Sequence, residues 1–122
     1  MALERNQIKP PVLPKEAVQV DALGGELIVR GLLLSQRLEM SALNAGLSAP
    51  LAGETELQAR ARAGGRLVAN TLARCVVLAD GEPMWSADQW DQFGATHPEP
   101  VLHLFKVARR LGGHDEEAIE KN

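Results

Sequence analysis

The longest periodic pattern in the sequence covers residues 55–78 and predicts one long helix. Thr55 is a suitable N-cap, because its hydroxyl can accept a hydrogen bond from an otherwise unpaired N–H of the first turn. We expect Cys75, near the other end, to be a buried and unreactive thiol. Between them, small and apolar residues recur at spacings of three and four, which places them on one helical face: Leu57, Ala61, Gly64, Val68, Leu72 and Cys75.

The pair Gly64-Gly65 lies inside this helical pattern. Each glycine in a helix interior costs about 1 kcal/mol relative to alanine. We expect the close approach of another backbone to offset that cost. The alternative is a kink or a break in the helix at this pair.

Before the long helix, two short segments alternate apolar and polar residues, the pattern of half-buried strands. We expect strands at about 17–23 and 26–31, joined by a tight turn in which Gly24-Gly25 adopts positive φ angles. A lone hairpin is only marginally stable in water. This one must therefore pack on helices or pair with the edge of another chain.

Residues 1–16 contain Pro10, Pro11 and Pro14. Proline fixes φ and lacks a backbone donor, so we expect an extended, proline-rich arm. The arm is either a disordered tail or a segment that docks on a partner or a neighbouring subunit.

A short helix is predicted between the hairpin and the long helix, from Ser35 as its N-cap to about Leu43. Its inward-facing residues are expected to be Leu34, Leu38 and Met40. Residues 44–53 then form a loop, because two glycines and a proline punctuate them.

Two further helix starts follow a turn at residues 80–81. Ser86 and Gln89 have the spacing of a capping box, and Trp85 and Trp90 occupy the N′ and N4 positions of a hydrophobic staple. Phe93 follows on the same face as Trp90. The stretch that holds most of the chain's aromatic residues is therefore predicted to be a helix start with a core-facing side.

The last helix is predicted to begin with Thr96 as its cap and Glu99 at the third position. Pro98 and Pro100 then lie in the first turn, where a missing N–H costs nothing. The helix should end at residues 112–113, which are both glycines. Its apolar face is expected to hold Val101, Leu104, Phe105, Ala108 and Leu111.

Together these elements predict a mainly α (α+β) fold, in which an N-terminal β-hairpin is followed by about four helices. The 122 residues fit a single domain. We place it at residues 17–113, between the arm of residues 1–16 and an acidic flexible tail at residues 114–122.

Composition excludes several classes of partner. The net charge of −3 argues against nucleic acid, because phosphate neutralisation needs a basic surface. No apolar run approaches the roughly 20 residues of a membrane span, so no membrane partner is expected. The single cysteine cannot form an internal disulfide, and no signal peptide is visible, so we expect a cytoplasmic location.

No site chemistry is recognisable. Residues 80–91 carry acids at positions 1, 3, 9 and 12 of a twelve-residue segment. A calcium loop is not expected, because Met84 lacks the fifth ligand and Trp85 stands where the loop needs glycine. His97, His103 and His114 lack the spacing of a zinc pair. No nucleophile or nucleotide motif occurs, so we expect no catalytic residue, no metal, no cofactor and no enzymatic activity.

Charge is segregated along the chain. Residues 58–79 carry four arginines and no acid, whereas residues 80–100 carry five acids and no base. Either the two blocks pair within the fold, or they form a bipolar surface suited to head-to-tail self-association or to a charged partner. The candidate partner-binding residues are Trp90, Phe93, Arg60 and Arg66.

The order of elements resembles the tail assembly chaperones of long-tailed (siphovirus-type) bacteriophages. The resemblance covers residues 17–122 and is most specific over residues 74–122, which include CVVLADGEPMWSADQWDQFGATHPEPVLHLFKVARRLGG and the acidic end EEAIEKN. It implies a non-enzymatic helical protein in the host bacterial cytoplasm, absent from the mature virion. Its partners would be the tape-measure protein, which it keeps soluble, and the tail-tube protein, whose subunits it helps to recruit.

The resemblance also implies a longer product made by programmed frameshifting. Residues 120–122, Glu-Lys-Asn, can be encoded by GAA-AAA-AAC, which contains the slippery sequence A-AAA-AAC.

Two alternatives to the chaperone stay open. One is a small helical DNA-binding regulator that reads DNA with its arginine-rich helix, although the acidic net charge argues against it. The other is a structural tail or head–tail joining protein.

Overall fold

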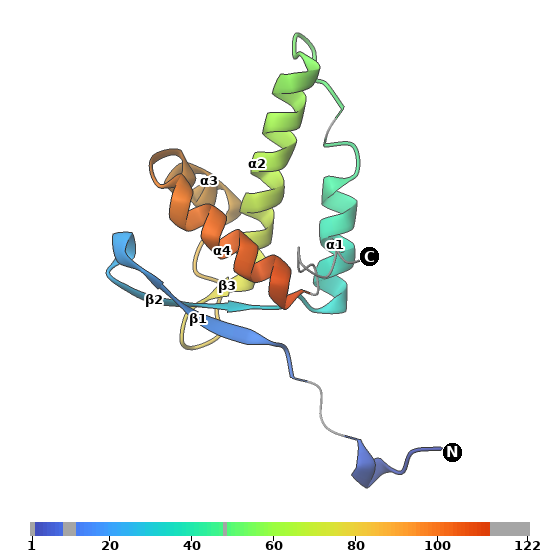
Figure 1. Cartoon of the computed structure of the whole chain (residues 1–122). Helices are drawn as coiled ribbons and strands as arrows, with labels where there is room; N and C mark the ends of the chain where they lie inside the picture. The colour runs from blue at the N-terminus through green and yellow to red at the C-terminus, as the bar shows by residue number, and fades with distance from the viewer. Residues whose placement is uncertain (1, 9–11, 48, 113–122) are drawn as a thin grey trace, which may run out of the picture.

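A computed structural model describes residues 2–8, 12–47 and 49–112. The tail predicted at residues 114–122 lies outside the described residues, as does the second glycine expected to end the last helix. The described chain forms a single α+β domain, as predicted, in which the helices stand on one face of a small sheet (Figure 1). In order, the elements are a 3-10 turn Arg5–Gln7, β1 Lys15–Val20, a 3-10 turn Asp21–Leu23, β2 Gly25–Arg30, α1 Leu34–Asn44, α2 Glu56–Cys75, β3 Val76–Val77, α3 Ala87–Thr96 and α4 Pro98–Leu111.

The hairpin forms, but its turn differs from the prediction. β1 ends at Val20, which pairs with Gly25, and the residues between them make a 3-10 turn. Gly24 closes this turn in the left-handed region, with φ of 76°. Only the first glycine of the pair therefore needs a positive φ, and the predicted first strand was too long at its end.

A third strand was missed by the sequence analysis. The long helix was expected to reach residue 78, but α2 ends at Cys75 and the next two residues form β3. Val76 pairs with Val29 and Val77 with Ile28, antiparallel to β2. Both valines of β3 are buried, and β-branched side chains suit a pleated, packed surface better than a helix end. These two residues therefore pair with the free edge of β2 instead of continuing the helix.

The core lies between the sheet and the helices α2, α3 and α4. Its largest fully buried side chains are Trp90, Leu72, Leu104, Val29, Val76 and Cys75. The hairpin therefore packs on helices, which was one of its two predicted alternatives. The predicted staple also forms: Trp85 and Trp90 meet edge to face with ring centroids 4.7 Å apart, a favoured aromatic geometry.

The short helix α1 is oriented differently from the prediction at two of its three expected inward residues. Its N-cap is Leu33 and not Ser35. Met40 is buried as expected, but Leu34 is 71 % exposed and Leu38 63 % exposed. Polar contacts help to set this orientation, because Arg37 and Glu39 on α1 also reach the rest of the domain. Their partners are the carbonyl of Gly112 and the guanidinium of Arg74.

The helix α2 is continuous through its glycine pair. Thr55 caps it as predicted, since its hydroxyl accepts a hydrogen bond from the backbone N–H of Gln58 at 3.1 Å. Apart from its chain neighbours and the adjacent backbone of α2, a Cβ added at Gly64 or Gly65 would meet no described atom within 4 Å. The expected close approach of another backbone is therefore wrong within the described fold, and no break replaces it. Leu57, predicted to face inward, is 77 % exposed.

The boundary between α3 and α4 was also misplaced. Thr96 does not cap α4 but ends α3, where its hydroxyl donates to the carbonyl of Phe93 at 3.3 Å. His97 is the N-cap, but its side chain makes no capping hydrogen bond, and Pro98 occupies the first helical position. Proline is favoured at that position because its φ is already helical. The predicted apolar face of α4 is correct: Val101, Leu104 and Ala108 are buried, and Phe105 and Leu111 are half-buried.

Candidate partner-binding surfaces

An apolar groove of about 430 Å³ lies between α2, α3 and the start of α4. Small residues leave the space: Ala61, Gly64 and Gly65 on α2, and Gly94 and Ala95 on α3. Larger apolar side chains complete the lining, namely Val68, Trp90, Val101 and Leu102. We call this hollow the glycine groove.

The two walls of the glycine groove carry opposite charges. Arg60 stands on the α2 wall and Asp91 on the α3 wall, and both side chains are exposed. Within the described residues, neither takes part in an ion pair. The groove is therefore an apolar slot bordered by one base and one acid.

The four candidate binding residues are placed differently from one another. Trp90 is 1 % exposed, so its ring belongs to the core, and its indole nitrogen is buried without a hydrogen-bond partner in the described structure. Phe93 is half-buried and stacks on His97, with ring centroids 4.6 Å apart. Arg66 pairs with Asp88 at 3.0 Å. Arg60 is the candidate whose charged group is exposed and unpaired among the described residues.

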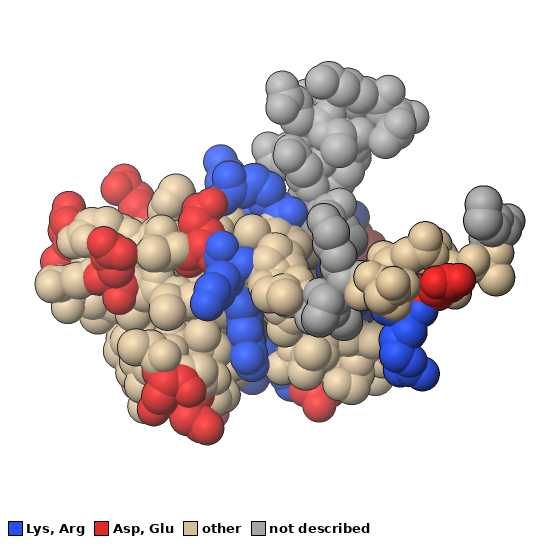
Figure 2. Space-filling view, turned by 90° about the horizontal axis from the view of Figure 1, so that it is seen from below, with Lys and Arg blue, Asp and Glu red and all other residues tan. Residues whose placement is uncertain are grey.

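The charge blocks pair with each other at one point in the described chain. Arg66 and Asp88 link the basic block on α2 to the acidic block. Arg62 instead pairs with Glu54 at 2.9 Å, and Arg74 pairs with Glu39 on α1. Seen from below, basic side chains form a band across the middle of the molecule while acidic ones gather mainly to one side of it (Figure 2). Pairing within the fold therefore accounts for only part of the segregation.

The outer side of α1 is a surface that sequence reasoning missed. Leu34 and Leu38 lie one turn apart, with Ala42 a further turn along, and all three are exposed. We call this row the α1 leucine face. Its spacing of four was visible in the sequence, but the spacing alone does not say whether such a face points to the core or to solvent.

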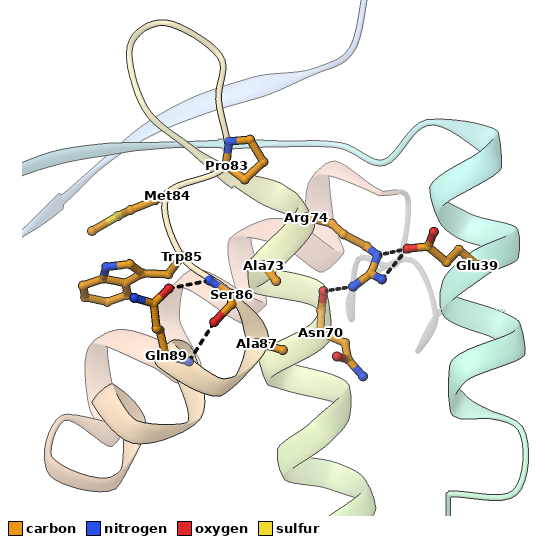
Figure 3. A pocket seen from close by; sticks show the side chains of 10 residues that line it. All are labelled: Glu39, Asn70, Ala73, Arg74, Pro83, Met84, Trp85, Ser86, Ala87 and Gln89. Carbon is orange, nitrogen blue, oxygen red and sulfur yellow. Dashed lines mark hydrogen bonds and ion pairs between the residues drawn. The ribbon is translucent and has the colours of Figure 1, made fainter.

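A second hollow, of about 530 Å³, lies where α1, α2 and the start of α3 meet (Figure 3). Its polar groups hold the fold together. Arg74 donates to the carboxylate of Glu39 at 2.6 Å and to the carbonyl of Asn70 at 2.9 Å. The hydroxyl of Ser86 and the side chain of Gln89 cap α3 reciprocally. These groups join helices and present no arrangement of nucleophile and base.

The cysteine and the metal-ligating residue types give no further site. Cys75 is buried, and desolvation raises the pKa of its thiol to about 11 against the opposing influence of three arginines. Such a thiol is a poor nucleophile at neutral pH. Among residues 2–8, 12–47 and 49–112, no group of three or more His, Cys, Asp or Glu side chains could hold a metal ion. Nor does a helix of that part of the chain have the length and apolar character needed to cross a membrane.

Comparison with known proteins adds no relative. No family model matches the chain, and neither a curated protein nor a solved structure is significantly similar to it. The candidate binding surfaces therefore rest on this structure alone. They are the glycine groove and the α1 leucine face.

Proposed function

We propose that this protein is a non-enzymatic tail assembly chaperone of a long-tailed bacteriophage. It acts in the host bacterial cytoplasm, binds the tape-measure protein, helps to recruit tail-tube subunits and is absent from the mature virion. The element order of residues 17–122 supports the choice of family, and the surface of the helical part supports the binding role.

The observation that carries the proposal is the concentration of exposed leucines in one part of the chain. Residues 33–57 contain six leucines that are at least 43 % exposed: Leu33, Leu34, Leu38, Leu43, Leu51 and Leu57. They lie on α1 and its N-cap, at the start of α2 and in the loop between the two helices, the part that projects from the sheet (Figure 1). Clustered exposed apolar residues mark interaction surfaces. A protein that keeps a long apolar partner soluble needs such a surface.

The DNA-binding alternative receives less support. Three of the four arginines in the basic block are engaged with carboxylates: Arg62, Arg66 and Arg74. A helix that reads DNA offers its arginines to phosphates and base edges. Arg60 alone does not give α2 that character.

Co-expression with the tape-measure protein encoded by the same phage genome tests the proposal. The soluble fraction of the tape-measure protein should rise when this chain is present. The double variant Leu34→Glu/Leu38→Glu should lose most of that effect, because charged groups replace apolar contact area. Leu78→Glu, at an exposed leucine beyond β3, is the matched control and should retain it.

Two results would refute the chaperone role. The first is a tape-measure protein equally insoluble with and without the chain. The second is the presence of this protein in purified virions, which would favour the structural tail or head–tail joining alternative. In the gene, A-AAA-AAC at codons 120–122 followed by an open −1 frame would support a frameshifted longer product.

A further inference from the structure

Another hollow, of about 420 Å³, lies on the face of the sheet that the helices leave uncovered. Leu27, Val29 and Val76 belong to the core on the helical side. Successive side chains of a strand point to opposite faces, so Ile28 and Val77 face away from the helices. They line the hollow together with Val12, Leu13, Lys15, Arg30, Leu78, Ala79 and Gly81. We call it the sheet hollow. In Figure 1 the helices stand above the sheet, so the view from below in Figure 2 faces this side.

Lys15 and Arg30 bring two positive charges together at one end of the sheet hollow. They stand directly opposite each other on β1 and β2, and like charges in that position destabilise a strand pair. Among the described residues, neither takes part in an ion pair, and no acid lines the hollow. The Nε atom of Arg30 is also buried without a hydrogen-bond partner in the described structure. A bound carboxylate would relieve the repulsion and accept hydrogen bonds from the two side chains.

The remainder of the lining is apolar. Val77 is buried and Ile28 is half-buried, whereas Val12 is 82 % exposed and Leu78 is 44 % exposed. The sheet hollow therefore combines a pair of cations with an apolar surface beside them. It suits a peptide segment in which carboxylates and an apolar side chain are close together in the sequence.

One segment of this chain has that composition. Residues 115–120, Asp-Glu-Glu-Ala-Ile-Glu, place four acids around an alanine and an isoleucine. They lie outside the described residues and follow α4 after a short connection. Their carboxylates complement the charges of Lys15 and Arg30, and Ile119 complements the apolar part of the hollow.

The end of α4 lies close to both bases. A Cβ added at Gly31 would lie 3.3 Å from the ring of Pro14 and 3.5 Å from the carbonyl oxygen of Leu111. Gly31 directly follows Arg30, and Pro14 directly precedes Lys15. The last turn of α4 is therefore next to the ends of β1 and β2 that carry the two charges.

The connection from α4 is long enough to reach them. Asp115 is three positions beyond Gly112, and an extended chain spans about 3.3–3.6 Å per residue, so Asp115 reaches roughly 10 Å from the end of the helix. Glu116 and Glu117 reach further. Because the segment is tethered, its effective concentration at the sheet hollow is on the order of millimolar, and weak contacts are sufficient to hold it there.

We propose that the sheet hollow binds the chain's own acidic segment, residues 115–120. The carboxylates of residues 115–117 pair with Lys15 and Arg30, and Ile119 covers the apolar part of the hollow. While the segment is bound, this face of the sheet is closed to other acidic peptides, which have to displace it. The contact uses neither the glycine groove nor the α1 leucine face, so it does not depend on the proposed chaperone role.

Paramagnetic relaxation in the isotope-labelled full-length chain measures this contact. A nitroxide is attached through Ala118→Cys, and the unmodified chain is the control for labelling at Cys75, which is buried. The nitroxide should broaden the amide signals of Ile28 and Ala79, which lie on different strands or loops around the hollow. In about 1 M salt, where the Debye length is about 3 Å, the broadening should fall to the level of a tethered but unbound segment.

Neutral variants identify the bases that hold the segment. Lys15→Gln/Arg30→Gln should reduce the broadening to its level at high salt, and the fold should persist because the change removes a repulsion. Arg109→Gln is the matched control. Arg109 is an exposed base in the last turn of α4 and does not line the sheet hollow, so this variant should keep the broadening. Circular dichroism confirms folding of each variant.

A charge exchange tests the pairing directly. Lys15→Glu/Arg30→Glu should abolish the contact, because acids then face acids. Adding Glu116→Arg/Glu117→Arg to that variant should restore the broadening, because the charges are again opposite.

Three outcomes would overturn the proposal. One is equal broadening in the wild type and in Lys15→Gln/Arg30→Gln. Another is loss of the broadening in Arg109→Gln, which would place the segment on α4 instead of the sheet. The third is broadening in a mixture in which the nitroxide and the isotope label are on different copies, which would show that the bound segment comes from a second molecule. None of them bears on whether the tape-measure protein is made soluble, so the two proposals fail separately.

Discussion

Filling the glycine pair of α2 with methyl groups should stabilise the isolated domain. In Gly64→Ala/Gly65→Ala, neither new Cβ meets a described atom within 4 Å beyond its own stretch of helix, so no packing penalty offsets the gain. Each replacement recovers about 0.8–1 kcal/mol of helix propensity, partly by restricting the unfolded chain. The double variant should therefore gain about 2 kcal/mol in its free energy of unfolding, which corresponds to roughly 6–10 °C in Tm.

Urea denaturation followed by circular dichroism measures this gain, at a protein concentration where the chain is monomeric. Gly24→Ala is the control, because Gly24 has φ of 76° and alanine is strained there. That variant should lose about 1 kcal/mol or more. If the double alanine variant is instead less stable than the wild type, α2 is not a continuous open helix at this point, and the basis for the glycine groove is lost.

Three further predictions concern the core and two titrating groups. Leu104→Ala should lower the free energy of unfolding by about 2–5 kcal/mol in a denaturant melt, because Leu104 is fully buried. Leu102→Ala, at an exposed site on the same helix, should lower it by under about 0.5 kcal/mol. Equal losses would contradict the core assignment. Cys75 should react with a thiol reagent at neutral pH only after unfolding, since burial raises its thiol pKa to about 11; rapid labelling of the native protein would be inconsistent with that burial. The hydrogen bond from Arg62 lowers the pKa of the Glu54 carboxyl, so its contribution to stability is present above the ordinary value of 4.5 and is lost as the pH falls through the lower folded value. Glu54→Gln should accordingly be less stable than the wild type at neutral pH but not in acid, and a difference independent of pH would argue against the ion pair.

Local signals predicted much of this fold. The caps of α2 and α3 depend on residues three positions apart, so Thr55 and Ser86 could be recognised without knowing the rest of the structure. The same holds for the staple of Trp85 and Trp90, and for the apolar face of α4. In each of these cases, the residues that decide the conformation are neighbours in the sequence.

The predictions failed where residues distant in the sequence determine the conformation. Val76 does not continue α2, because it pairs with the edge of β2, a strand that is distant in the sequence. Leu38 points outward because Glu39 reaches Arg74. No periodicity within α1 contains that information. The candidate surfaces were missed for the same reason: the glycine groove is assembled from three helices, and of the residues that line it only Arg60 and Trp90 were predicted to bind a partner.

The brief strand β3 has a consequence for the order in which the chain folds. The β1–β2 turn closes over a few residues, but pairing Val77 with Ile28 encloses α1 and α2 in a loop of about 50 residues. Closing that loop costs roughly 2 kcal/mol more in chain entropy than closing the hairpin. We expect the hairpin to form early and β3 to join it only after α2 has packed against α3 and α4. In pulsed hydrogen exchange, the amides that join β1 and β2 should then become protected before those that join β2 and β3. Simultaneous protection would show that the sheet forms in one step.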